Sequence, residues 1–487
     1  MDYQNRAAFF HAFELPTLIY VFVYTVLLFD NFSAITLPIW VVATLTYVYV
    51  CLNKLKLPVK PGFWIYGAGM FLLAISVMCT GSTPLQFFGN VGILILLIAL
   101  LLHSFRNDKN WTLAKYFSAF VYTIFGPIGC IGDLFGDAHA DHTLQKNTKK
   151  AITTYILIGI AIAVPMLMIL GALLYFSDAV FANILDRSFL DYLKPGKVLG
   201  WLTLFAFALA SSYCTIRFLC KPNLTGEVHD RRNFEPVVAI TVLLPITLIY
   251  GLFCGIQIFS LFLGKMQLPE GYTYAEYARE GFFQLLFVCI INVIIVLFVN
   301  GLFRENPVQK ILMTLISACT YIMLASSAFR MLLYIKAYHL TFLRILVLWA
   351  LLVIALLLIG VIMEIYYRPF PLARYMMAII TVLFLALSFL HPDYIIASYN
   401  LHHTAEETVE DSRGYEDHWY LASLSTDAAP AIMEYYHTEE SGGQDVSAWI
   451  NSYAQRHELH YSDSPRRFNV SRYIAHRQTQ DILKLNE

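Results

Sequence analysis

The densest group of polar side chains beside an apolar run lies at residues 273–285. Thr273 and Glu276 have the spacing of a capping box, so the start of a helix explains both of them. A helix start does not explain Arg279 or Glu280, and Glu276 and Glu280 lie four residues apart, where like charges repel. A basic group nearby would relieve this repulsion, so the segment is a candidate polar or binding site.

Arg330 is the clearest basic candidate, because it lies inside an apolar run five residues before the run ends. One interpretation is a guanidinium that snorkels about 8 Å to the interface, at about 1.5 Å per residue. The other is an ion pair with Glu276 or Glu280, since charges inside a membrane usually face a partner or a cavity. Arg344 begins the next apolar run and is typical of an interfacial anchor.

No pattern in the chain predicts a metal site or a cofactor. Acids and histidines crowd residues 133–142, which we interpret as a Gly-rich polar loop, and residues 402–407, but neither group has a recognised ligand spacing. The eight cysteines include no CxxC pair and are typical of small buried hydrophobes. No spacing indicates a Ser-His-Asp or Cys-His constellation, so we predict no cofactor and favour a protein that is not an enzyme.

Composition places these residues in a membrane protein. The chain is 58% hydrophobic and 14% charged, whereas soluble domains are about 45–50% apolar and about 25% charged. These values exclude a disordered chain, a nucleic-acid binder and an ordinary cytosolic enzyme, and they indicate the lipid bilayer as a partner. Residues 1–396 hold 26 Lys and Arg against 19 Asp and Glu, a net charge of +7, and residues 397–487 hold 7 against 15, a net charge of −8. We predict a membrane body followed by an acidic soluble tail.

The apolar runs predict an all-α, polytopic transmembrane bundle. A crossing helix needs about 20 apolar residues, and lipid cannot satisfy the backbone of other structures. We count about eleven spans, at residues 15–29, 34–52, 61–79, 87–102, 151–176, 198–220, 236–263, 281–303, 311–335, 340–367 and 372–390.

Two further segments are predicted to lie at the membrane surface. Residues 111–135 begin with a short apolar run that Gly126 and Pro127 end, which is typical of an interfacial segment. Residues 177–195 form an amphipathic pattern, with charged residues that include Asp178 away from the apolar face.

Lysines and arginines in the loops predict the orientation. With the N-terminus in the cytoplasm, the inner segments hold 18 of these residues and the outer loops 8. Eleven spans then make the tail extracytoplasmic, although a crossing at 111–125 would return it to the cytoplasm. On the first alternative, one outer polar site covered by the tail would contain Asp178, Glu276, Arg279, Glu280, Arg330, Tyr334, Arg344 and His391.

The tail itself is predicted to be a small helical module that could bind a protein partner. Its candidate helices are residues 416–424, 428–436, 448–459 and 469–485, with residues 425–427 as a cap for the second. Val470, Tyr473, Ile474 and Arg477 form one periodic face of the last helix.

Several stretches taken together resemble a known family. They are residues 177–181, 273–285, 330–334, 340–344, 420–431 and 468–472, and residues 273–285 are the most specific. The resemblance is to a bacterial multispanning membrane family known only as a domain of unknown function. It implies a bacterial plasma-membrane protein and no particular activity. His339 departs from the family pattern, which would have glycine before Leu340.

Three function classes stay open. Polar residues and prolines within spans favour small-molecule transport or sensing. A membrane enzyme acting on lipid-linked substrates is less favoured, because the first outer loop, residues 30–33, is far too short for the acidic motif of such transferases. An assembly scaffold that uses residues 397–487 is supported by the tail's composition alone.

Overall fold

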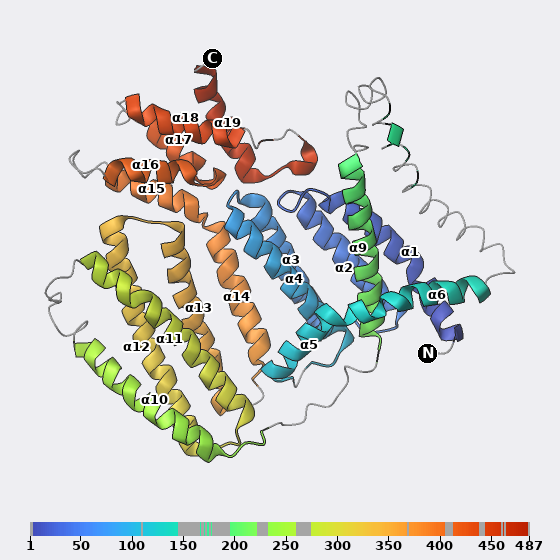
Figure 1. Ribbon diagram of the computed structural model, residues 1–487, viewed down its shortest axis with the longest axis horizontal. Coiled ribbons are helices and arrows are strands. Elements are labelled where there is room, and N and C mark those ends of the chain that lie inside the picture. Colours follow the sequence, from blue (N-terminus) through green and yellow to red (C-terminus); the bar gives the residue numbers. More distant parts are fainter. Residues whose placement is uncertain are drawn as a thin grey trace.

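The chain folds into two lobes of helices with a smaller group of helices across one end (Figure 1). The computed structural model describes residues 3–108, 111–144, 195–221, 232–259, 274–367, 370–404, 413–437, 444–458 and 464–485, with Tyr461 and a few single positions between 166 and 177. Within these residues β pairing is limited to one isolated bridge between Phe234 and Phe303. The predicted all-α class is confirmed.

The N-terminal lobe is built around one large apolar core. Trp40, Met70 and Leu100 are buried in it, each contributed by a different helix. Prolines sit at the start of several helices of this chain, where the missing backbone N–H costs nothing. The lobe contains α1 (Tyr3–Leu28), α2 (Thr36–Lys54), α3 (Pro61–Cys79), α4 (Thr83–Phe105), α5 (Leu113–Phe125), the 3₁₀ helix η1 (Gly126–Cys130), α6 (Ile131–Leu144) and α9 (Pro195–Leu219).

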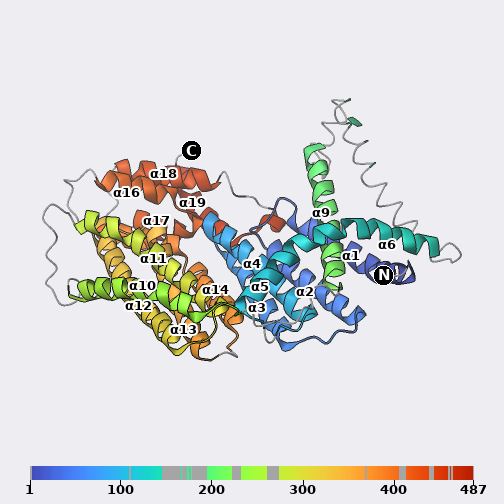
Figure 2. The same cartoon turned by 60° about the horizontal axis from the view of Figure 1, so that its bottom comes forward.

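The C-terminal lobe has cores of its own and meets the first lobe through α14. Phe282, Cys289 and Leu358 lie in one of its cores, while Phe384 and Leu387 of α14 belong to the core of the N-terminal lobe. Figure 2 shows α14 beside α3 and α4, between the lobes. The lobe contains α10 (Pro236–Gln257), α11 (Tyr274–Leu302), α12 (Pro307–Tyr338), α13 (Phe342–Tyr366) and α14 (Leu372–Phe389).

Eleven helices in the described part of the chain are long and apolar enough to cross a membrane. Ten of them coincide with predicted spans, whereas the predicted span at 151–176 and the surface segment at 177–195 lie outside the described residues, single positions apart. The eleventh, Leu113–Asp141, joins α5, η1 and α6 where we predicted an interfacial segment, and α6 runs across α9 in Figure 1.

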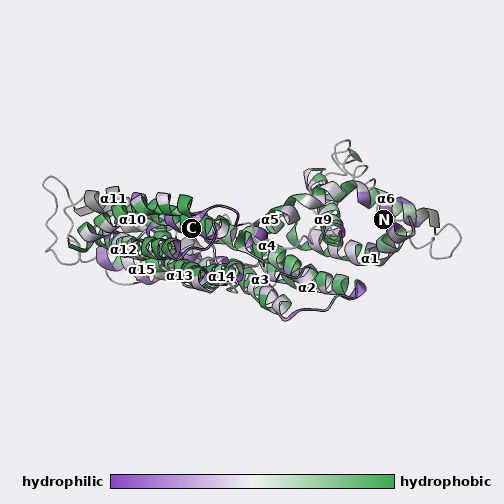
Figure 3. Cartoon of the chain, turned by 90° about the horizontal axis from the view of Figure 1, so that it is seen from below, coloured by the Kyte–Doolittle hydropathy of each residue, from purple (hydrophilic) through white to green (hydrophobic). Residues whose placement is uncertain are grey.

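The outer surface of the lobes is apolar, as lipid contact requires. Val237 and Leu252 of α10 are 67% and 69% exposed, and Figure 3 shows apolar residues along α10 and its neighbours. Such a continuous apolar surface would be unstable in water. The protein is therefore an integral, multi-pass membrane protein.

The helices after α14 form a cap over one end of both lobes (Figure 1). The cap has its own apolar core, in which Ile396, Ile432 and Tyr453 are fully buried. The boundary that we placed after residue 396 falls within the first cap helix, and Ile396 already belongs to the cap core. The cap contains α15 (Pro392–Thr404), α16 (Arg413–Ser423), η5 (Thr426–Ala428), α17 (Ala429–His437), α18 (Gln444–Glu458), η7 (Pro465–Arg467) and α19 (Val470–Leu485).

The last cap helix packs through small residues rather than through its periodic apolar face. Ser471, Ala475 and Thr479 are buried, while Tyr473 and Ile474 are 38% and 39% exposed. Small side chains allow α19 to lie close to α17 and α18, so the larger side chains point outward.

The turn between α12 and α13 explains why glycine is expected at position 339. His339 has φ 59° and ψ −174°, a conformation that is nearly restricted to glycine. The imidazole is therefore held at a strained position.

We predict that His339→Gly is more stable than His339→Ala by about 1–2 kcal/mol, the cost of a Cβ at positive φ. Both variants remove the imidazole, so the difference isolates the backbone. Thermal unfolding of the purified protein measures it. Lys336→Gly, in the last turn of α12, should instead lose about 1 kcal/mol. Equal stability of the two His339 variants would contradict the prediction.

Candidate functional site

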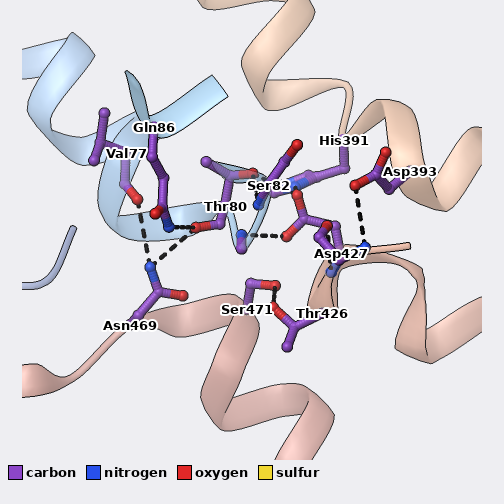
Figure 4. A network of polar contacts seen from close by, with 12 residues as sticks. Val77, Thr80, Ser82, Gln86, His391, Asp393, Thr426, Asp427, Asn469 and Ser471 are labelled. Carbon is purple, nitrogen blue, oxygen red and sulfur yellow. Dashed lines mark hydrogen bonds and ion pairs between the residues drawn. The ribbon is translucent and has the colours of Figure 1, made fainter. Parts of the chain in front are cut away.

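The polar groups that the fold brings together most closely lie where the cap meets the ends of the two lobes (Figure 4). Asp427 in η5 is at the centre and is 6% exposed. Its carboxylate accepts hydrogen bonds from the Thr80 hydroxyl and from the Gly81 backbone N–H at 2.7 Å. The turn between α3 and α4 thus supplies two donors to one buried acid of the cap.

Local sequence explains how Asp427 reaches that turn. The Ser425 side chain accepts a hydrogen bond from the Asp427 N–H at 3.3 Å and caps η5, as the sequence indicated for residues 425–427. The short 3₁₀ helix joins α16 to α17. It holds the Asp427 carboxylate against the α3–α4 turn.

His391 and Asp393 complete the charged part of the junction. His391 Nδ1 lies 3.4 Å from Asp427 Oδ2, and Asp393 Oδ2 accepts the Ser425 N–H at 3.3 Å. Burial alone would raise the pKa of Asp427, but hydrogen bonds from His391, Ser471 and Thr80 lower it below its ordinary value. The hydrogen bond to Asp427 raises the pKa of His391, and burial raises the pKa of Asp393.

Asn469 is the second anchor of the cap on the N-terminal lobe. Its side-chain amide donates to the backbone oxygens of Ser33 at 2.9 Å and Thr80 at 3.0 Å. These two acceptors belong to different turns, α1–α2 and α3–α4. Beside it, the hydroxyls of Thr426 and Ser471 are 2.7 Å apart. The amide therefore fixes both turns to the start of α19.

The segment before α19 binds the α1–α2 turn through both backbone and side-chain groups. The Ile35 N–H donates to the Phe468 carbonyl at 2.9 Å, and Arg466 donates to the Phe29 carbonyl at 2.6 Å. Arg467 forms an ion pair with Asp30 at 2.6 Å. One backbone pair and two arginine side chains therefore hold this segment against the turn.

The cap also binds the C-terminal lobe, at the α12–α13 turn. Asn400 of α15 donates to the Leu340 carbonyl at 3.0 Å and accepts the Leu340 N–H at 2.9 Å. The Tyr420 hydroxyl accepts the Phe342 N–H at 2.9 Å. The cap therefore binds turns from both lobes.

A cleft of about 530 Å³ lies between the cap and the bundle beside this junction. Asp393 and Tyr420 contribute polar groups to it, and Pro84, Phe342 and Leu424 form apolar wall. The remaining lining residues are Gly81, Ser82, Thr83, Ser423, Ser425, Thr426, Arg456, His457 and Arg472.

Of the site residues predicted from sequence, Tyr334 and Arg344 lie near the cap. The Arg344 guanidinium is 4.3 Å from the Tyr334 ring centroid and donates to the carbonyls of Tyr338 and His339, at the end of α12. Burial raises the pKa of Tyr420, and the positive charge of Arg344 partly opposes this rise.

The other predicted residues are placed differently. Arg330 is 7% exposed and donates to the Gln257 side chain of α10 at 3.5 Å, so it is buried rather than snorkelling. Glu276, Arg279 and Glu280 lie in the first turns of α11, but their side chains and Asp178 are outside the described residues. Their pairing with Arg330 stays a prediction.

The acid-rich stretch 133–142 belongs to helix α6 rather than to a loop, which corrects our interpretation. Its acids have separate partners: Lys221 is 2.7 Å from Asp133, and Arg217 is 3.0 Å from Asp137. Asp141 faces His11 and Glu14 of α1, the one His/Cys/Asp/Glu group within the described residues whose spacing could hold a metal.

The sequence placed His391 in the outer polar site, but it indicated Asp427 and Asn469 only as parts of the stretches 420–431 and 468–472 that carry the family resemblance. The available signal was a single acid in an otherwise small and apolar stretch, as at residues 427–431. Spacing along the chain could not reveal partners several hundred residues away.

Fold and junction together define a multispanning helical membrane protein with a helical cap docked on one face. The chain matches the family described as Domain of unknown function (DUF4153) over residues 67–435 and belongs to it. We expected the resemblance to run from about residue 150 to near the C-terminus, whereas the match begins at residue 67 and ends at residue 435; it includes Asp427 and the α3–α4 turn. No curated protein and no solved structure matches the chain.

We predict that docking of the cap weakens as pH rises above the ordinary imidazole value of about 6.5. Protonated His391 stabilises docking below the ordinary imidazole value of about 6.5, and this contribution is lost as pH rises through the raised pKa of His391. Asp393 acts in the same direction, because its raised pKa favours the neutral form in the docked cap. Asp427, with a lowered pKa, weakens docking only under strongly acidic conditions.

Hydrogen-exchange protection factors of α17 and α19 measure this change, since they correct for the chemical exchange rate. His391→Asn, which tolerates the positive φ at this position, should remove the part of the change near neutral pH. Asp393→Asn should keep that part. An unchanged pH profile in the His391 variant would contradict the assignment.

Steric contact at Gly81 gives a second test of the junction. A Cβ added there would lie 1.8 Å from Thr426 Oγ1, so Gly81→Ala should undock the cap and lower the protection of α19 by at least about tenfold, the effect of about 1.4 kcal/mol. Thr426→Ala in the same chain should restore part of the loss. Gly251→Ala, in open space on α10, is the matched control. No loss in Gly81→Ala would show that the cap does not rest on this turn.

Proposed function

We propose that this chain is a non-enzymatic protein of the bacterial plasma membrane that recognises a small molecule at its extracytoplasmic face. Recognition would occur in the cleft between cap and bundle, and the purpose would be sensing or transport. The observation that carries the proposal is that the cap binds turns of both lobes around a buried carboxylate and leaves a cleft of mixed polarity beside it. Pockets of this kind are typical ligand sites.

The distribution of basic residues supports an extracytoplasmic cap. The α1–α2 and α3–α4 turns at the cap end contain no lysine or arginine. The N-terminal end of α1 is at the opposite end of the bundle (Figure 1). Cytoplasmic loops are enriched in lysine and arginine, and the helix ends away from the cap carry Lys54, Lys60, Arg106, Lys221, Arg232, Arg304, Lys310 and Arg374.

The order of the helices agrees with this arrangement. The chain leaves α4 at the end away from the cap, where Arg106 donates to the carbonyl of Leu219 at the end of α9. It must therefore return to the cap end before α9 begins. One net crossing between residues 106 and 195 would suffice, which supports an N-terminus and a cap on opposite sides.

Coupling between ligand and membrane body would follow from the shared contacts of the cap. Asn469 and Asp427 bind the N-terminal lobe, while Asn400 and Tyr420 bind the C-terminal lobe. A ligand that favours one position of the cap would therefore favour one arrangement of the lobes. Transport is the second candidate, supported by a buried polar chain inside the C-terminal lobe, in which Asn292 joins Tyr250 at 2.7 Å and Thr320 at 3.0 Å.

Full-length fusions test the sidedness on which the proposal depends. Alkaline phosphatase placed after Glu487 should be active, because it folds only outside the cytoplasm, and a fluorescent protein at the same position should stay dark. The same fluorescent protein before Met1 is the control and should fluoresce. A bright C-terminal fusion with an inactive phosphatase would overturn the proposal.

A further inference from the structure

The acidic cap directs a group of arginines toward the membrane body. Residues 397–487 hold 7 Lys and Arg against 15 Asp and Glu. Even so, Arg466 and Arg467 bind the α1–α2 turn, and Arg456 and Arg472 line the cleft. Positive charge is thus concentrated on the inner surface of a negative module.

Arg466 and Arg467 are accounted for by docking, but Arg472 is not. Arg472 is half-buried in the first turn of α19, and burial and the nearby Arg467 lower its pKa. Among the described residues neither Arg472 nor Arg456 has an acidic partner. A half-buried guanidinium without a counter-ion is costly, and an anion in the cleft would remove that cost.

Arg472 lies between two hollows and is accessible from both. It lines the cleft beside Asp393 and also a second hollow of about 410 Å³ beside the α1–α2 turn. A planar guanidinium suits phosphate, which it can bind through two parallel hydrogen bonds. The geometry therefore provides a cation at the point where the two hollows meet.

The rest of the cleft fits a phosphate group attached to a less polar body. Hydroxyls of Ser82 and Thr83 are further donors, and Pro84 and Phe342 form an apolar wall. Asp393 is the one carboxyl in the lining, and burial raises its pKa.

We propose that the cleft between cap and bundle binds a phosphate group, held by Arg472 and Arg456, with the remainder of the ligand against Pro84 and Phe342. The proposal rests on the function proposed above and names its ligand class. A phosphorylated solute and a phospholipid headgroup share this chemistry.

Inorganic phosphate is the probe, titrated calorimetrically into the full-length protein in phosphatidylcholine nanodiscs near neutral pH. Wild type should bind saturably, and Arg472→Gln should bind at least about tenfold more weakly, as expected for losing a charge-assisted hydrogen bond. Arg477→Gln is the matched control on the same helix, since Arg477 is exposed and lies by Tyr473. It should bind as wild type does.

Nanodiscs that contain phosphatidylglycerol distinguish the two sources. A headgroup that occupies the cleft would weaken phosphate binding by wild type in these discs, and a soluble ligand would leave it unchanged. If Arg472→Gln lowers the hydrogen-exchange protection of the cap even without ligand, the cap itself is disturbed. In that case the phosphate affinity of Arg456→Gln, a change at an exposed residue, is the test instead. The inference is overturned if wild type shows no saturable binding of phosphate. It is also overturned if Arg472→Gln and Arg456→Gln both bind phosphate as tightly as wild type does. The fusion experiment would then show separately whether the cap is extracytoplasmic.

Discussion

The structure depends on one buried carboxylate, that of Asp427. A buried charge is costly unless its oxygens are fully hydrogen-bonded, and the donors for Asp427 come from Thr80 and Gly81 of the membrane body. Neither the cap nor the α3–α4 turn can satisfy its polar groups alone. The cap is therefore completed by the bundle, although it has an apolar core of its own.

Different kinds of contact join the lobes at the two ends of the bundle. At the cap end the contacts to the C-terminal lobe are neutral and use backbone groups, as between Asn400 and Leu340. At the other end they are charged: Asp108 of the N-terminal lobe lies 2.7 Å from Arg374 of α14 and also binds His103.

Sequence reasoning succeeded where local chemistry decides and failed where partners are distant. The cap helices and the turn at Ser425 followed from capping and periodicity, and the glycine expected at 339 matches its positive φ. Closely spaced glycines made α6 look like a loop, because its acids pair with Arg217 of α9 and with Lys221 just after that helix, about 80 positions away. The sequence likewise showed the apolar face of α19. It did not show that the small residues of this helix, rather than that face, pack against the rest of the cap.

Composition and hydropathy by themselves determined that this is a helical, multispanning membrane protein with an acidic module at its end. These properties follow from the length of apolar runs and the need to satisfy the backbone within lipid. Only the tertiary structure decided which polar residues meet. Gly81 and Asp427 are 346 positions apart, and their contact exists because three helix-joining turns are brought to one face. No spacing rule extends over such a distance, since it is the packing of whole helices that brings these groups together.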